Sequence, residues 1–200
     1  MDSVLPILGL TLTLAGTLAL FLLRQWRWVL AALAAQSLGA GLLALTIVAL
    51  PIALVEIATG WLVAGILALT LRREGMGTIE SSVIPPGILF RGLLALMVSI
   101  AAVALLPDVG GVLNNPPTVV SLGAINLIAF GLLGMGLNDQ PLRAGVALVT
   151  TLQGFALAYL WSERSLLVIA LLAAVHLTVA LSVIYLHAVT RKSAEEEVRT

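Results

Sequence analysis

Long apolar stretches with almost no charge are the feature that most constrains this chain. Of its 200 residues, 60% are hydrophobic and 10% are charged, whereas an ordinary soluble domain is about 25% charged. So few charges cannot cover a water-facing surface, which excludes a soluble enzyme, a nucleic-acid binder and a disordered chain. The class that remains is a polytopic membrane protein.

Seven stretches are long enough to cross a bilayer as helices, because a crossing takes roughly 20 mostly apolar residues. They cover residues 5–23, 28–47, 52–71, 88–106, 118–137, 142–161 and 165–186. The second and third are separated only at Pro51, and a single helix over 28–71 would be about 66 Å long, roughly twice a membrane. We expect a tight apolar turn at 48–51, because proline cannot donate the hydrogen bond of a helix interior.

The basic residues divide unequally between the two sides of this arrangement. With the N-terminus outside and the C-terminus in the cytoplasm, nine of the ten Lys and Arg residues fall in cytoplasmic segments, and only Arg164 lies outside. This matches the excess of positive charge in cytoplasmic loops. We therefore expect an all-α protein with seven transmembrane helices in the inner (plasma) membrane. One domain would cover residues 1–190, and a polar cytoplasmic tail would cover 191–200.

Five polar side chains inside the apolar stretches are the candidate functional residues. A polar group in the middle of a membrane is costly unless it meets a partner, which makes each one a functional candidate. From the rise of about 1.5 Å per residue in a helix, we expect Gln36, Asn126, Gln153 and His176 near the midplane and Glu56 closer to the outside.

Each of these residues has more than one interpretation. Gln36, Asn126 and Gln153 could hold helices together, at about 0.6–2 kcal/mol each, or form a polar axis through the protein. His176 could exchange protons near neutral pH or act as a neutral hydrogen-bonding group. Glu56 has no Lys or Arg in its own span, so it could carry protons, pair with another subunit, or simply stay protonated.

The sequence lacks the motifs of a catalytic or cofactor-binding protein. It has no cysteine, no glycine-rich nucleotide loop after a strand and no HExxH or His-x-x-x-His pattern. No basic cluster suggests a nucleic-acid partner. The segments between spans are also too short to hold an active site. We expect no catalytic residues, no metal and no cofactor in this chain.

Several short elements resemble one family of membrane subunits. Residues 35–38, Ala-Gln-Ser-Leu, resemble the Gln-Ser-Leu element of the component-E membrane subunit of hydrogenase-4 and formate hydrogenlyase complexes. Residues 141–143, Pro-Leu-Arg, and 152–154, Leu-Gln-Gly, resemble that family's Leu-Arg helix start and its Glu-Asn-Gly-type element. Chain length, helix count and orientation are similar over nearly the whole chain.

The first three spans resemble a second, related family. Residues 1–73 are similar to the three-helix 4L (K) subunit of respiratory complex I, and the four spans in 88–190 follow as a separate part. Residues 56–60, Glu-Ile-Ala-Thr-Gly, resemble the buried Glu-x-x-x-Gly of that subunit's third helix. Both families belong to proton- or sodium-translocating membrane arms, where their polar residues help join a hydrophilic module to antiporter-like subunits.

The sequence departs from these families at their charged positions. Gln153, His176 and Gly60 stand roughly where component E has a glutamate, an aspartate and a lysine. Gln36 falls near a second-helix glutamate of the 4L subunit. Glutamine cannot take and release a proton as glutamate can. The resemblance implies either a proton route through Glu56, His176 and water, or a degenerate scaffold.

The resemblance implies an accessory membrane subunit of a hydrogenase-4-like or complex-I-like proton- or cation-translocating redox complex. Its partners would be antiporter-like and quinone- or hydrogenase-linked membrane subunits, which would hold the redox centres. Two alternatives stay open: a stand-alone seven-helix transporter or channel, and a membrane anchor with no translocation activity of its own.

Overall fold

The computed structural model describes residues 4–74, 88–112, 115–138, 140–163 and 165–197. All regular elements in these ranges are α-helices, which confirms the all-α expectation for this part of the chain. They are α1 (Val4–Leu22), α2 (Trp26–Ala44), α3 (Leu50–Glu74), α4 (Ile88–Ala104), α5 (Leu106–Val112), α6 (Thr118–Gly136), α7 (Pro141–Ser162) and α8 (Leu166–Glu197).

Six of these helices are long and apolar enough to cross a membrane. They are α1, α2, α3 as far as Arg72, α6, α7 and α8 as far as Thr190. The described chain therefore has the character of a multi-pass membrane protein. The fourth expected span, at 88–106, corresponds to α4, which is apolar but has only 17 residues.

The break between α2 and α3 covers residues 45–49, slightly before the turn expected at 48–51. α2 ends at Ala44, whose carbonyl accepts hydrogen bonds from the N–H groups of Ile47 and Val48, both at 2.9 Å. α3 then begins at Leu50, which puts Pro51 in its first turn. A proline is tolerated there, because the first-turn N–H groups have no partner inside the helix.

Two elements differ from the sequence expectation. The fourth span is expected at 88–106, but α4 ends at Ala104 and a second helix, α5, begins at Leu106 with Pro107 in its first turn. At the other end of the chain, α8 continues to Glu197, through most of the segment expected to be a tail. That segment is rich in Ala, Glu, Lys and Arg, which favour helix whether or not they are apolar.

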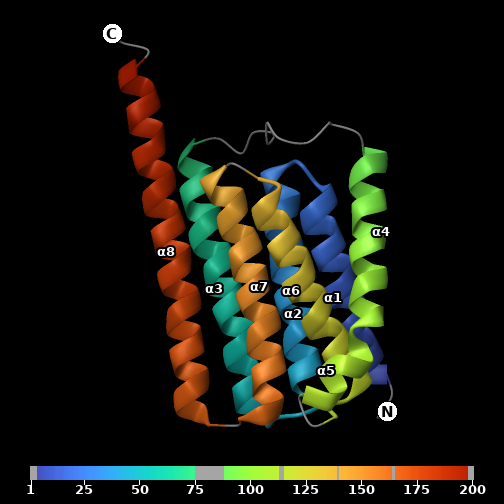
Figure 1. Ribbon diagram of the computed structural model, residues 1–200. Helices are drawn as coiled ribbons and strands as arrows, with labels where there is room; N and C mark the ends of the chain where they lie inside the picture. Colours follow the sequence, from blue (N-terminus) through green and yellow to red (C-terminus); the bar gives the residue numbers. More distant parts are fainter. Residues whose placement is uncertain (1–3, 75–87, 113–114, 139, 164, 198–200) are drawn as a thin grey trace.

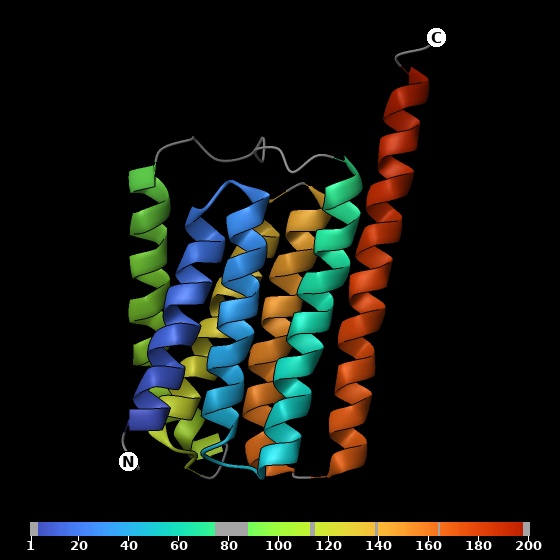
Figure 2. The same ribbon diagram turned by 180° about the vertical axis from the view of Figure 1, so that it is seen from behind.

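The helices form two layers that face each other (Figures 1 and 2). One layer holds α1, α2 and α3, and the other holds α6, α7 and α8, so that α1 packs on α6, α2 on α7 and α3 on α8. α4 packs on α1 and α6 at one edge, and α8 closes the opposite edge against α3 and α7. The central pairs α1–α2 and α6–α7 thus enclose the middle of the bundle.

Basic residues gather at one end of the bundle, which we call the basic end. The ends of α1, α3 and α8 and the starts of α2, α4 and α7 lie together there, at the top of Figure 1. The arginines that belong to these helix ends are Arg24, Arg27, Arg72, Arg91 and Arg143. The end that carries the start of α1 and α5 is called the opposite end.

Glycines set how closely the central helices approach. A Cβ on Gly39 of α2 would lie 2.5 Å from the backbone nitrogen of Thr13 in α1, and one on Gly131 of α6 would lie 2.6 Å from the backbone nitrogen of Thr151 in α7. Small residues at such points allow membrane helices to pack backbone to backbone. The close approach brings the polar side chains of these helices within hydrogen-bonding reach.

Candidate functional site

Four buried polar side chains meet in the middle of the bundle. The Gln36 amide of α2 donates from Nε2 to Oε1 of Gln153 in α7, at 2.9 Å. Its Nε2 also lies 3.4 Å from Oγ1 of Thr150, and its Oε1 lies 3.3 Å from Oγ1 of Thr17 in α1. All four residues are at most 3% exposed. We call them the central polar cluster.

The glutamine pair is the strong contact of this cluster. Thr17 and Thr150 each have one hydroxyl proton, and each donates to its own helix, to the carbonyls of Thr13 (2.7 Å) and Val146 (3.0 Å). The contact of the Thr17 hydroxyl with Oε1 of Gln36 is therefore weak, and the contact in which Thr150 accepts from Nε2 of Gln36 is long, at 3.4 Å. The bond between Gln36 and Gln153 is the short side-chain hydrogen bond that joins the two layers in the middle of the bundle.

The cluster separates two apolar cores. On α2, Gln36 lies between Leu33 of one core and Ala40 of the other. On α7, Gln153 lies in the same way between Val149 and Leu157. The polar contact is thus surrounded by hydrocarbon along the bundle axis, where each hydrogen-bonding group needs a partner.

Gly60 of α3 allows a third helix to reach this site. A Cβ at Gly60 would clash with Oγ of Ser37 and would lie 3.3 Å from Nε2 of Gln153. Any larger side chain, including the lysine that component E has near this position, would not fit without moving α3.

Asn126 and His176 are buried but turn toward their own helices. Asn126 is 2% exposed and donates from Nδ2 to the Leu122 carbonyl at 2.9 Å. His176 is 3% exposed, and its Nδ1 lies 2.8 Å from the Leu172 carbonyl. Oδ1 of Asn126 and Nε2 of His176 are buried without a hydrogen-bond partner among the described residues. No hydrogen bond within the described ranges joins either residue to the central polar cluster.

Glu56 is a buried carboxyl group between the cluster and the opposite end. It is 7% exposed, and within the described part of the chain it makes no hydrogen bond or ion pair. It precedes Gly60 on α3 by one turn, which places it about 6 Å further from the basic end. This position agrees with the depth expected from the sequence.

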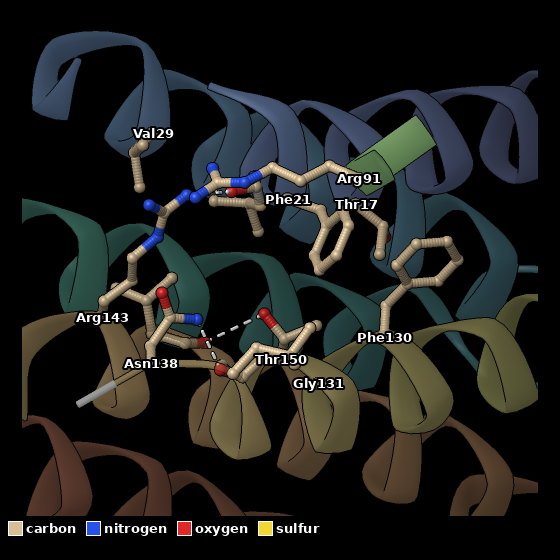
Figure 3. Close-up of a pocket in the computed structure, with 14 residues that line it drawn as sticks. Thr17, Phe21, Val29, Arg91, Phe130, Gly131, Asn138, Arg143 and Thr150 are labelled. Atoms are coloured by element: carbon tan, nitrogen blue, oxygen red, sulfur yellow. Dashed lines mark hydrogen bonds between the residues drawn. The ribbon is translucent and has the colours of Figure 1, made fainter. Parts of the chain in front are cut away.

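A cavity connects the central polar cluster with two arginines of the basic end (Figure 3). It has a volume of about 40 Å³ and is lined by residues of α1, α2, α4, α6 and α7. Arg91, Arg143 and Asn138 form its polar lining at one side, and Thr17 and Thr150 contribute hydroxyls from the cluster. A volume of this size has room for about three water molecules.

The sequence did not single out Thr17 or this cavity. Thr13 and Thr17 are four residues apart on an apolar helix, and with Gly9 and Gly16 they make up most of the buried face of α1. The four-residue spacing of these threonines is the sequence feature that could have pointed to Thr17. From the sequence, Arg91 and Arg143 contribute only to the excess of positive charge that predicts the orientation in the membrane, because nothing in the sequence shows that they approach each other.

The described residues bring no three His, Cys, Asp or Glu side chains together in a way that could hold a metal ion. Comparison with protein families, curated proteins and solved structures finds no match for this chain. The expected kinship with hydrogenase-4 component E and complex I subunit 4L stays a prediction.

Proposed function

We propose that the chain is an accessory membrane subunit of a proton- or cation-translocating redox complex of the hydrogenase-4 or complex I type. The observation that carries this proposal is the bond between Gln36 and Gln153 in the middle of an apolar bundle. Both glutamines belong to the short elements that resemble component E. Polar groups at such depth are costly, and they commonly mark ion or proton pathways.

The proposal includes seven membrane crossings, with α4 as the one added to the six long helices. Its 17 residues would span about 25 Å, slightly less than the hydrocarbon core of about 30 Å, a mismatch that a bilayer accommodates at modest cost. Its exposed side chains are apolar along its whole length, as lipid contact requires: Leu89, Leu93, Leu96, Met97, Ile100 and Val103.

The orientation follows from the basic end. Positive charge favours the cytoplasmic side, so we assign the basic end to the cytoplasm and the opposite end to the outside of the inner membrane. The N-terminus would then lie outside, and the C-terminal end of α8 in the cytoplasm.

Glu56 and His176 would be the protonatable groups of this subunit. They lie on α3 and α8, which pack on each other at one edge of the bundle. Gln36, Asn126 and Gln153 would order water or hold helices. Oδ1 of Asn126 and Nε2 of His176 have unused hydrogen-bonding capacity that water or a partner could meet.

Partner subunits would cover part of the apolar outer surface. Among the six long helices, α8 buries the smallest share of its residues within the chain. Its exposed Leu167, Leu171 and Leu181 can contact lipid or a neighbouring helix. Antiporter-like and quinone- or hydrogenase-linked subunits would supply the redox centres, and this chain would need no cofactor.

Identification of the partners is the first test. The tagged protein is extracted from its native membrane in a mild detergent, and co-purifying proteins are identified by mass spectrometry. Antiporter-like subunits together with hydrogenase- or quinone-linked subunits support the proposal. A protein that remains alone after gentle extraction contradicts it and favours a stand-alone transporter or a membrane anchor.

Substitutions then test the two protonatable groups. Glu56→Gln keeps the shape of the side chain and removes its titratable proton. His176→Asn also removes the titratable group and keeps the shape approximately. We expect slower proton pumping by the assembled complex in each variant, with assembly unchanged. Thr178→Val on α8 is the control, because Thr178 is exposed and bonds only to the Ala174 carbonyl of its own helix. Wild-type pumping in the Glu56→Gln and His176→Asn variants would rule out their relay role.

A further inference from the structure

The cavity at the basic end contains a donor that the fold leaves unused. Arg143 is 6% exposed, and its Nη2 donates to the carbonyls of Leu23 (3.0 Å) and Leu20 (3.5 Å). These carbonyls belong to the last turn of α1 and the residue after it, where no helical N–H follows to bond them. The other terminal nitrogen, Nη1, is buried and has no hydrogen-bond partner among the described residues. One half of the guanidinium thus holds α1, and the other half is available to a ligand.

A second guanidinium faces the same space. Arg91 of α4 lines the cavity and is also 6% exposed. In Figure 3 the side chain of Arg91 extends toward the guanidinium of Arg143. Arg91 and the nearby Arg24 are both close enough to Arg143 to repel it electrostatically.

The unused half of the Arg143 guanidinium needs compensation. Removing a charge from water is costly unless an opposite charge or several hydrogen bonds replace the water. Among the described residues that line the cavity there is no Asp or Glu. Helix-end carbonyls compensate part of the charge of Arg143, but they cannot reach Nη1.

The chemistry of the two arginines selects the kind of ligand. A guanidinium offers parallel N–H donors that match the oxygens of a phosphate. The cavity volume of about 40 Å³ admits a few oxygen atoms and no large organic group. Arg91 is the fourth residue of α4 and Arg143 the third of α7, so both lie within about one turn of the basic end. That is the depth at which lipid phosphates lie in a bilayer.

We infer that Arg91 and Arg143 form a binding site for a phosphate-type anion, which a lipid headgroup or a free phosphate would supply. Nη1 of Arg143 and the guanidinium of Arg91 bind its oxygens, while Nη2 of Arg143 keeps its bonds to α1. The inference does not depend on the proposed function, because it uses only the geometry of the cavity.

The experiment compares ligands on the purified full-length protein in mild detergent. Native mass spectrometry measures retention of phosphatidylglycerol and of diacylglycerol, which has the same tails and no phosphate. Thermal unfolding with and without inorganic phosphate measures the free anion. We expect phosphatidylglycerol to bind at least tenfold more tightly than diacylglycerol.

Variants assign the binding to this site. Arg91→Gln removes one charge without touching the carbonyls of α1, and we expect it to weaken phosphatidylglycerol binding at least tenfold. Arg72→Gln is the matched control, because Arg72 is an exposed arginine at the same end and does not line the cavity; its binding should equal that of the wild type. Arg143→Lys, which keeps the charge and loses the fork, should weaken binding while retaining most of the thermal stability.

Each outcome is decisive. Loss of phosphatidylglycerol binding in Arg91→Gln but not in Arg72→Gln supports a lipid phosphate. The ligand is a free anion if phosphatidylglycerol is not retained and inorganic phosphate raises the melting temperature of the wild type but not that of Arg91→Gln. Equal effects in Arg91→Gln, Arg72→Gln and the wild type for both ligands would overturn the inference.

Discussion

The hydrogen bond between Gln36 and Gln153 is expected to appear as a coupling free energy between the two layers of the bundle. Gln36→Leu and Gln153→Leu each remove one partner while keeping the side-chain volume similar. After either change the remaining amide loses its short partner in an apolar core, and Nε2 of Gln36 keeps only the 3.4 Å contact in which Thr150 accepts. In the double variant no amide is left behind.

The structure sets the size of the effect. The bond is short, at 2.9 Å, and both side chains are at most 2% exposed. Hydrogen bonds between membrane helices contribute about 0.6 kcal/mol on average and up to about 1.7 kcal/mol, and an orphaned buried group costs about 1–3 kcal/mol. We expect each single substitution to lower the free energy of unfolding by about 1–2 kcal/mol. The double variant should cost no more than one of them, which gives a coupling of about 1 kcal/mol.

The assay is a double-mutant cycle on reversible unfolding in mixed micelles of mild detergent and sodium dodecyl sulfate. A second cycle, between Gln36 and Asn126, is the control, because Asn126 bonds to the Leu122 carbonyl of its own helix. Residues without shared partners should be additive within about 0.5 kcal/mol. A Gln36–Gln153 coupling no larger than that of the control pair would refute the reasoning.

Three further predictions test packing and topology. Gly131→Ala should destabilise the fold by about 1–3 kcal/mol, because its Cβ would lie 2.6 Å from backbone of α7, whereas Gly65→Ala, whose Cβ meets nothing within 4 Å, should leave thermal stability equal or higher. Trp61→Phe removes an indole N–H that donates to an α2 carbonyl at 3.1 Å, and unfolding should become easier by about 0.6–1.7 kcal/mol. The chain has no cysteine, so a membrane-impermeant thiol reagent should label Thr118→Cys from outside intact cells and Arg27→Cys only after lysis; the reverse pattern would invert the proposed orientation.

Helix positions could be predicted from the sequence because an apolar helix ends where polar residues lower the local hydropathy. The second span, expected at 28–47, is α2 at Trp26–Ala44, and the turn expected at 48–51 lies slightly earlier, at 45–49. The rise per residue also gives the depth of a side chain, which is why Gln36 and Gln153 could be predicted to lie at a similar depth. Both properties depend on position along a helix axis.

Which direction a side chain faces could not be predicted. A helix that is apolar on all sides has no amphipathic pattern to show which face is inside. Asn126 and His176 are expected at the same depth as the glutamines, but nothing in their sequence context indicates that they turn to carbonyls of their own helices. Arg91 and Arg143 meet for the same reason: their approach depends on how α4 and α7 pack, and charge counting cannot reveal it.

The order of polar groups along the bundle constrains any proton route. From the basic end inward come the two buried arginines, then the hydroxyls of Thr17 and Thr150, and then the glutamine pair, with Glu56 beyond them. Buried arginines raise an electrostatic barrier against cations in a narrow passage. If the chain takes part in proton transfer, we therefore expect protons to reach Glu56 from the opposite end or from a neighbouring subunit, and not through the cavity. Arg91→Gln lowers that barrier. In proteoliposomes it should increase passive proton leak if the cavity leads to the glutamines, whereas an unchanged leak would show that the apolar core seals the passage without the arginines.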